Sequence, residues 1–132
     1  MSTVQNGKAF EYACLRSLYE SLSPAQEVFI EETPQLETAR SFFEGSSNDF
    51  QGRFVKAANA ATRVIIRLEP QLEFPANNIP LYLSIQADKQ GQLGDVRDVL
   101  CIRRQNEWEI GLSCKHNHHA VKHNRLSAAS IF

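Results

Sequence analysis

The stretch that decides the fold reads GDVRDVLCIRRQNEWEIGLSCKHNHHAVKHNRL and runs from Gly94 to Leu126. Its first part, Val96 to Arg103, is rich in apolar and β-branched residues, which predicts a strand. From Trp108 to Cys114 apolar residues alternate with polar or small ones, which predicts a second strand with one buried face. We therefore expect strand, turn, strand and the beginning of a helix, in that order.

The turn between these strands decides which residues lie together. A two-residue loop at Gln105 and Asn106 would pair Asp98 with Ser113 and make Lys115 the diagonal neighbour of Asp98. Diagonal Cα atoms are about 7–8 Å apart, within reach of a long side chain. Gln-Asn is not the favoured Asn-Gly loop, and a slip of one residue would move Lys115 to the other face.

Asp98 and Lys115 on one face suggest a chemistry. A carboxylate at a strand can bind a hard cation such as Mg²⁺ through oxygen. Such a metal polarises a phosphoryl oxygen and lowers the pKa of bound water, while a nearby lysine orients the water and offsets phosphate charge. This pair therefore predicts a metal-dependent phosphodiesterase. The alternative is a cross-strand ion pair, which is what most Asp–Lys neighbours are.

The two segments GDVRDVLCIRR, from Gly94, and WEIGLSCKHNHHAVKHNRLS, from Trp108, resemble the HaeIII-like family of type II restriction endonucleases. These are nucleases of the PD-(D/E)XK superfamily. The resemblance implies an α/β restriction-endonuclease-like three-layer core, Mg²⁺ as cofactor and double-stranded DNA with GGCC sites as substrate. It also implies that Asp98 is a metal ligand and that Lys115 is the catalytic lysine of the superfamily.

The chain departs from the superfamily pattern at Ser113, where an acidic residue is usual. The missing charge can come from Asp95, Glu109 or Glu11. We rank Glu11 first as a catalytic residue and metal ligand, because members of the superfamily often use a glutamate of the first helix. Glu109 lies too far along its strand from Lys115, at about 3.3 Å per residue, to bind the same ion.

The segment after the second strand is basic. No Asp or Glu occurs from Ile110 to Phe132, although the whole chain has a net charge of −1. Local basic patches, rather than total charge, attract phosphates. We expect DNA contacts from six residues of this segment, namely His116, Asn117, His118, Lys122, His123 and Arg125. The alternative is that they are surface residues, with Asn117 capping the expected helix.

The histidines also permit a zinc hypothesis. His119 and His123 are four residues apart on the expected helix, and His116 precedes them. Such spacing can bind zinc, and a histidine close to the end of a strand in a strand–strand–helix unit is also typical of ββα-metal nucleases. Paired cysteines and an HExxH motif are both absent from the sequence, so the zinc signal is weak.

Composition bounds the class of protein. A chain of 132 residues has room for one domain, residues 1–132, and 42% hydrophobic with 22% charged residues is typical of a soluble globular protein. Cys14, Cys101 and Cys114 have no paired spacing, which favours free thiols in a reducing cytoplasm. We find no signal peptide and no run of membrane-spanning length in the sequence.

The first two thirds of the chain are mainly helical in pattern. Helices are expected over Gly7–Leu22, Pro34–Glu44 and Asp49–Glu69, a short helix or irregular segment over Pro24–Glu32, and a first strand over Leu81–Ala87. The long helix carries Arg53, Lys56, Arg63 and Arg67. A solvated face is the simpler interpretation of these charges, and phosphate contacts are the alternative.

The expected order is helices, an antiparallel three-strand meander and a following helix, which suits an α/β (α+β) core. The chain ends soon after that helix would begin, so we expect an N-terminal fragment or a truncated member of the family. The function we expect is Mg²⁺-dependent cleavage of double-stranded DNA by a cytoplasmic enzyme. A homodimer would suit a palindromic site, and a cognate DNA methyltransferase would be a functional rather than physical partner. The alternatives are an inactive DNA-binding remnant and a zinc-stabilised nucleic-acid-binding domain.

Overall fold

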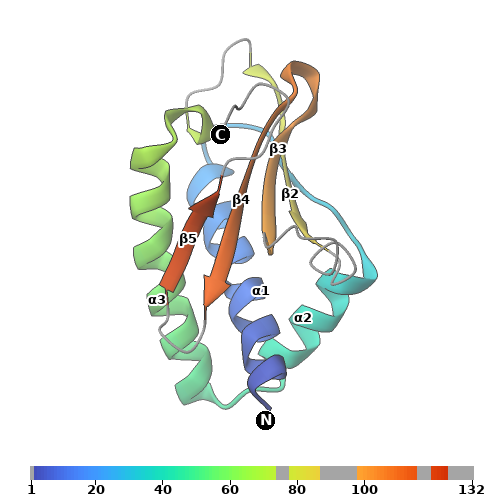
Figure 1. Cartoon of the computed structure of the whole chain (residues 1–132), viewed down its shortest axis with the longest axis vertical. Coiled ribbons are helices and arrows are strands. Elements are labelled where there is room, and N and C mark those ends of the chain that lie inside the picture. The colour runs from blue at the N-terminus through green and yellow to red at the C-terminus, as the bar shows by residue number, and fades with distance from the viewer. Residues whose placement is uncertain (1, 74–77, 87–97, 116–119, 125–132) are drawn as a thin grey trace.

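The computed structural model describes residues 2–73, 78–86, 98–115 and 120–124, and side chains only as far as Cys114 in the last strands. Its described part is a five-stranded sheet in the order β1-β2-β3-β4-β5 with three helices (Figure 1). Helix α1 packs against the sheet and is flanked by α2 and α3. No helix among the described residues is long and apolar enough to cross a membrane.

Helix α1 spans Thr3–Leu22 and forms the centre of the core. It begins earlier than the expected Gly7, because Ser2 and Gln5 form a capping box that satisfies the first free backbone N–H groups. The predicted apolar stripe is confirmed, since all of its members are buried against the sheet and the other helices: Phe10, Cys14, Leu18 and Leu22.

Helices α2, Pro34–Glu44, and α3, Asn48–Leu68, lie where the sequence predicts them. The hydroxyl of Thr33 accepts the backbone N–H of Leu36, and the hydroxyl of Ser47 accepts that of Phe50. These N-caps fix the starting points of both helices, which explains why a local reading of the sequence finds them.

Strand β1, Val28–Ile30, contradicts the prediction of a short helix or irregular segment over Pro24–Glu32. It pairs in parallel with β2, Leu81–Ile85, with Val28 opposite Leu81. A strand of three residues is too short to show a period of its own. Its pairing is decided by a segment on the far side of α2 and α3, which no local pattern contains.

The predicted antiparallel meander is confirmed in β2, β3 (Val99–Arg103) and β4 (Trp108–Lys115). Val99 pairs with Leu112, which is the predicted register. The loop is longer than the expected two residues. Arg104–Asn106 form a single 3₁₀ turn, and Glu107 follows with a left-handed backbone at φ 55°. Each strand is shortened by one residue at this end, so the longer loop leaves the register unchanged.

The helix expected after Lys115 is wrong within the described residues. Ala120–Asn124 form strand β5, which pairs antiparallel with β4, and Ser113 lies opposite Lys122. The pairing satisfies the backbone groups along the outer edge of β4, which a helix in this segment would leave exposed. His123 is therefore in a strand and His119 lies outside the described residues, so the helical spacing behind the zinc hypothesis is lost.

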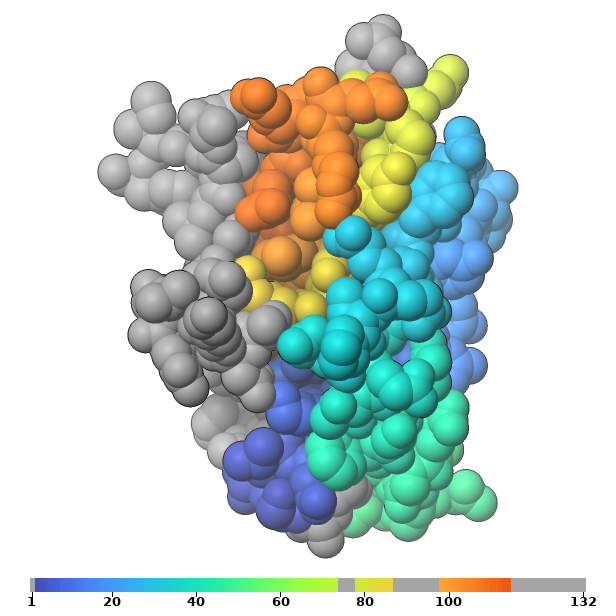
Figure 2. All heavy atoms as spheres, turned by 90° about the vertical axis from the view of Figure 1, so that its right-hand side faces the viewer, coloured from blue at the N-terminus to red at the C-terminus, as the bar shows by residue number. Residues whose placement is uncertain are grey.

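A buried arginine holds the far end of the meander. The guanidinium of Arg103 is fully buried and donates to the carbonyl oxygens of Gln71, Leu72 and Ile79 and to the side-chain oxygen of Gln26. Burial lowers its pKa. Figure 2 shows, from the side of α2, the orange turn between β3 and β4 beside the yellow β2 segment. Arg103 ties this end of the sheet to the loops that follow α1 and α3.

Candidate active site

Asp98 lies at the opposite end of the meander, directly before β3. Its backbone N–H donates to the carbonyl of Leu112 at 2.8 Å, and its carbonyl accepts the N–H of Gln86 at 2.8 Å. Its carboxylate Oδ2 accepts the backbone N–H of Cys114 at 2.7 Å. The carboxylate is therefore fixed where β2 and β4 both end, at the end of the sheet that leads to Lys115.

Strand β4 presents two different faces. Trp108, Ile110, Leu112 and Cys114 are all buried in the core, which confirms the predicted buried face. The expectation of an open polar face on the other side is wrong at Gly111 and Ser113, which are buried as well. The other face carries Glu109, Gly111 and Ser113, and Ser113 is only 3% exposed. Lys115 is the last residue of β4 and pairs with Ala120. Its side chain lies outside the described part of the chain, so Asp98 and Lys115 are brought together through the backbone register.

Glu11 of α1 and Asp98 both lie close enough to the Cys114 thiol to affect its pKa. The pKa of the Cys114 thiol is raised well above its ordinary value, first by a hydrogen bond with Cys14 and by burial. The negative charges of Asp98 and Glu11 raise it further. Two carboxylates from α1 and from the start of β3 thus act on one thiol, which places both near the carboxyl end of β4.

The predicted DNA-contact residues are only partly described. The backbones of Lys122 and His123 lie in β5, opposite Ser113 and Leu112. Asp95 and four of the expected contact residues lie outside the described residues: His116, Asn117, His118 and Arg125. Glu109 pairs with Ile102, near the start of β4 and away from Lys115.

The carboxylates present suit a hard cation. Among the described residues no group of three or more His, Cys, Asp or Glu side chains is arranged to hold a metal ion. Mg²⁺ does not need such a cage, because it is usually bound by one or two carboxylates and completes its shell with water and substrate phosphate. Asp98 and Glu11 each carry an oxygen donor of the kind that Mg²⁺ requires, whereas the neutral Ser113 adds little.

The sequence analysis did not predict the contact between Cys14 and Cys114 close to these carboxylates. Cys14 and Cys114 make contact between α1 and β4, and both are buried. In the sequence each belongs to an apolar stripe, so each was expected in the core, but nothing local pairs them. Their contact fixes the helix that carries Glu11 against the strand that ends at Lys115.

The mixed sheet with helices against it, and an acidic residue beside a strand that ends in Ser-Cys-Lys, define a restriction-endonuclease-like α/β fold. Residues 7–132 match the family model of the HaeIII restriction endonuclease, and this chain belongs to that family. It is similar to the type II restriction enzyme HaeIII of Haemophilus aegyptius, with 41% identity over 122 residues. The match covers 92% of this chain and 38% of that enzyme. No solved structure matches the chain.

Proposed function

We propose that this chain is the part of a type II restriction endonuclease that carries the catalytic lysine and two metal-binding carboxylates. The reaction is Mg²⁺-dependent hydrolysis of phosphodiester bonds in double-stranded DNA, with GGCC as the recognition sequence. The observation that carries the proposal is the Asp98 carboxylate, fixed at 2.7 Å from the Cys114 N–H, one residue before Lys115. Family membership supplies the chemistry that such an arrangement serves.

Asp98 and Glu11 are the proposed metal ligands. When bound, the Mg²⁺ ion polarises the phosphoryl oxygen and lowers the pKa of its water. The Cys114 N–H fixes the rotation of the Asp98 carboxylate before any ligand arrives. A carboxylate has several lone pairs, so accepting one backbone N–H is compatible with binding a cation as well.

Lys115 is proposed to orient the attacking water and to offset charge on the scissile phosphate. Its backbone pairs with Ala120 of β5, and β3 pairs with β4 as far as Leu112, three residues earlier. The neutral Ser113 leaves β4 itself without the acidic residue that is usual there, and Glu11 of α1 is proposed to supply the missing charge.

DNA contacts are proposed for His116, Asn117, His118, Lys122, His123 and Arg125. Lys122 and His123 belong to β5 beside the catalytic strand, so this part of the interface is strand-borne rather than helical. A homodimer that uses two sites on a palindrome, and a methyltransferase that protects the host sites, remain parts of the proposal.

The test is cleavage of plasmid DNA containing GGCC sites by the 132-residue chain, in Mg²⁺ and in EDTA. Discrete fragments that require Mg²⁺ are expected, and Lys115→Ala is expected to abolish them while the melting temperature is kept. Arg16→Ala is the matched control, since Arg16 pairs with Glu20 on the exposed side of α1. DNA binding without cleavage by the unsubstituted, folded chain would instead favour a non-catalytic DNA-binding remnant.

A further inference from the structure

The outer face of α3 carries a row of basic side chains. Its inner face buries Phe54, Ala58, Thr62 and Ile65. With 3.6 residues per turn, the basic residues of the helix fall within about a quarter of its circumference, on the side away from that core. All of them are exposed: Arg53, Lys56, Arg63 and Arg67.

Three of these side chains differ from the other surface cations. Arg16, Arg40, Arg53 and Arg104 each form an ion pair within 3.4 Å. Lys56, Arg63 and Arg67 have no ion-pair partner in the described part of the chain. These three side chains are therefore not used to hold the fold together by ion pairs, and their charge is available to a partner.

The charge of α3 also contrasts with that of the chain. The helix has four basic residues and one acidic residue, Asp49, which pairs with Arg53 at 3.0 Å. Its net charge is therefore +3, while the whole chain has −1. A positive face on a chain of slightly negative total charge is a local feature that a polyanion would recognise.

A hollow at the end of the row adds shape to the charge. It has a volume of about 560 Å³ and is lined by Ser21, Arg63, Ile66, Arg67 and Glu73. Two guanidinium groups and a hydroxyl are suitable donors for phosphate oxygens. Glu73 is the one group there that opposes an anion.

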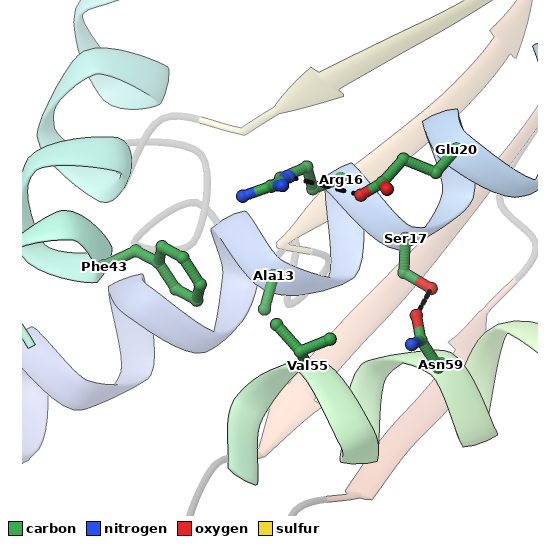
Figure 3. A pocket seen from close by; sticks show the side chains of 7 residues that line it. All are labelled: Ala13, Arg16, Ser17, Glu20, Phe43, Val55 and Asn59. Atoms are coloured by element: carbon green, nitrogen blue, oxygen red, sulfur yellow. Dashed lines mark hydrogen bonds and ion pairs between the residues drawn. The ribbon is translucent and has the colours of Figure 1, made fainter. Parts of the chain in front are cut away.

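A second hollow lies between α1, α2 and α3, and its charged groups are already paired with one another (Figure 3). Its volume is about 130 Å³. There Arg16 pairs with Glu20 at 3.2 Å, and the Ser17 hydroxyl donates to Asn59 at 2.7 Å. These polar groups bind one another, so this hollow gives no reason to expect an ionic ligand.

We propose that the outer face of α3, through Lys56, Arg63 and Arg67, binds the sugar–phosphate backbone of duplex DNA outside the cleaved sequence. Arg67 lies close to the end of the sheet that Arg103 holds, opposite the end with Asp98. The inference rests on the proposed function for its partner, DNA. Figure 1 shows α3 beside β5, the strand next to the one that ends at Lys115. From Lys56 to Arg67 the helix rises about 16 Å, and duplex DNA carries one charge per about 1.7 Å of its axis. The row is thus long enough to meet several phosphates.

The test is the salt dependence of DNA binding. Affinity for a fluorescent duplex containing GGCC is measured by anisotropy in EDTA, so that cleavage does not occur, over a series of NaCl concentrations. The triple variant Lys56→Gln, Arg63→Gln, Arg67→Gln is expected to lower the slope of log affinity against log salt by about 2.7, at about 0.9 per phosphate contact. Glutamine keeps the helix propensity and solubility of these exposed positions.

The matched control removes the same charge from ion-paired positions. The control is the triple variant Arg16→Gln, Arg40→Gln, Arg104→Gln, with its substitutions in α1, α2 and the β3–β4 turn. It lowers the net charge by the same amount and should change the salt slope by less than about 0.9, the value for one phosphate contact. Glu73→Gln should tighten binding a few-fold, because it removes the opposing charge from the hollow. Equal slopes for the two triple variants, or no DNA binding by the unsubstituted chain, would overturn the inference.

Cleavage separates this inference from the proposed function. If the α3 variant shows the lowered salt slope but the unsubstituted chain does not cut DNA in Mg²⁺, the inference about α3 is supported and the nuclease proposal fails. If the unsubstituted chain cuts DNA and the α3 variant has the same salt slope as that chain, the nuclease proposal is supported and the inference that α3 binds DNA is wrong.

Discussion

The two ends of strand β3 each hold a charged group, and the protein treats them in opposite ways. Arg103 at one end is fully buried and is surrounded by carbonyl oxygens. Asp98 at the other end is only half-buried and is fixed by the Cys114 N–H at a rim that also receives Glu11. The charge that holds loops together is sealed from solvent, whereas the charge that we propose to bind a metal stays at the edge of the core.

Removal of Arg103 should have the largest effect on stability. Arg103→Met leaves the buried carbonyl of Ile79 and the part-buried carbonyl of Gln71 without this donor, while the Leu72 carbonyl keeps the Gln26 amide as a donor. Each unsatisfied group costs about 1–3 kcal/mol. We expect the free energy of unfolding to fall by about 3–5 kcal/mol, measured by urea denaturation. Arg103→Lys, which keeps a charge and some donors, should lose less. A small loss for Met would mean that these loops are held by other contacts.

Removal of the charge at the other end should affect activity and spare the fold. Asp98→Asn keeps an oxygen that can accept the Cys114 N–H, so the free energy of unfolding should change by no more than about 1 kcal/mol. We expect cleavage to fall by at least about 100-fold if the carboxylate binds the metal. Normal cleavage by this folded variant would exclude Asp98 from the site and remove the contrast between the ends of β3.

Glu11 should have a smaller effect than Asp98. Glu11→Gln removes one of two proposed carboxylates, so higher Mg²⁺ concentrations should restore part of the lost cleavage. We expect an activity loss of about tenfold at limiting Mg²⁺, in the range typical of weakened metal ligation. Glu20→Gln, on the exposed side of the same helix, is the control. An equal loss at all Mg²⁺ concentrations would point to a role other than metal binding.

The smallest effect near neutral pH is expected from the buried thiols. Burial raises the pKa of Cys101 from 9.0 to about 12, with a small opposing effect of Arg103. The folded chain then disfavours the thiolate, so stability is unaffected below pH 9 and falls as pH rises from about 9 to 12. Cys101→Ala should flatten that fall in urea unfolding series. The same alkaline slope in the variant would assign it to other groups.

Local chemistry explains which parts of the fold could be predicted from the sequence. The caps Thr33 and Ser47 and the alternation along β4 are contained within a few residues each, so α2, α3 and the meander with its register were found. Strands β1 and β5 are defined by their partners, Leu81 and Ser113 among them, and were missed. The burial of Arg103 was missed for the same reason, because its hydrogen-bond partners come from three distant segments.

The candidate site divides in the same way. Asp98 and Lys115 follow from strand register, which the sequence contains, and the structure keeps that register. Glu11 came from the family resemblance, and only the packing of α1 on β4 brings it near. The proposed DNA contacts of His116 and its neighbours remain a prediction, since these residues lie outside the described part of the chain.

The parallel pairing of β1 with β2 has a consequence for how the protein folds. Val28 pairs with Leu81 across the whole of α2 and α3, while Arg103 pairs with Trp108 across one short turn. Closing a long loop has a larger entropic cost than closing a short one, and distant contacts slow folding. We expect the β3–β4 hairpin to form early and β1 to dock late. Until then the outer edge of β2 is open to other strands, so we expect intermolecular pairing at that edge to compete with folding.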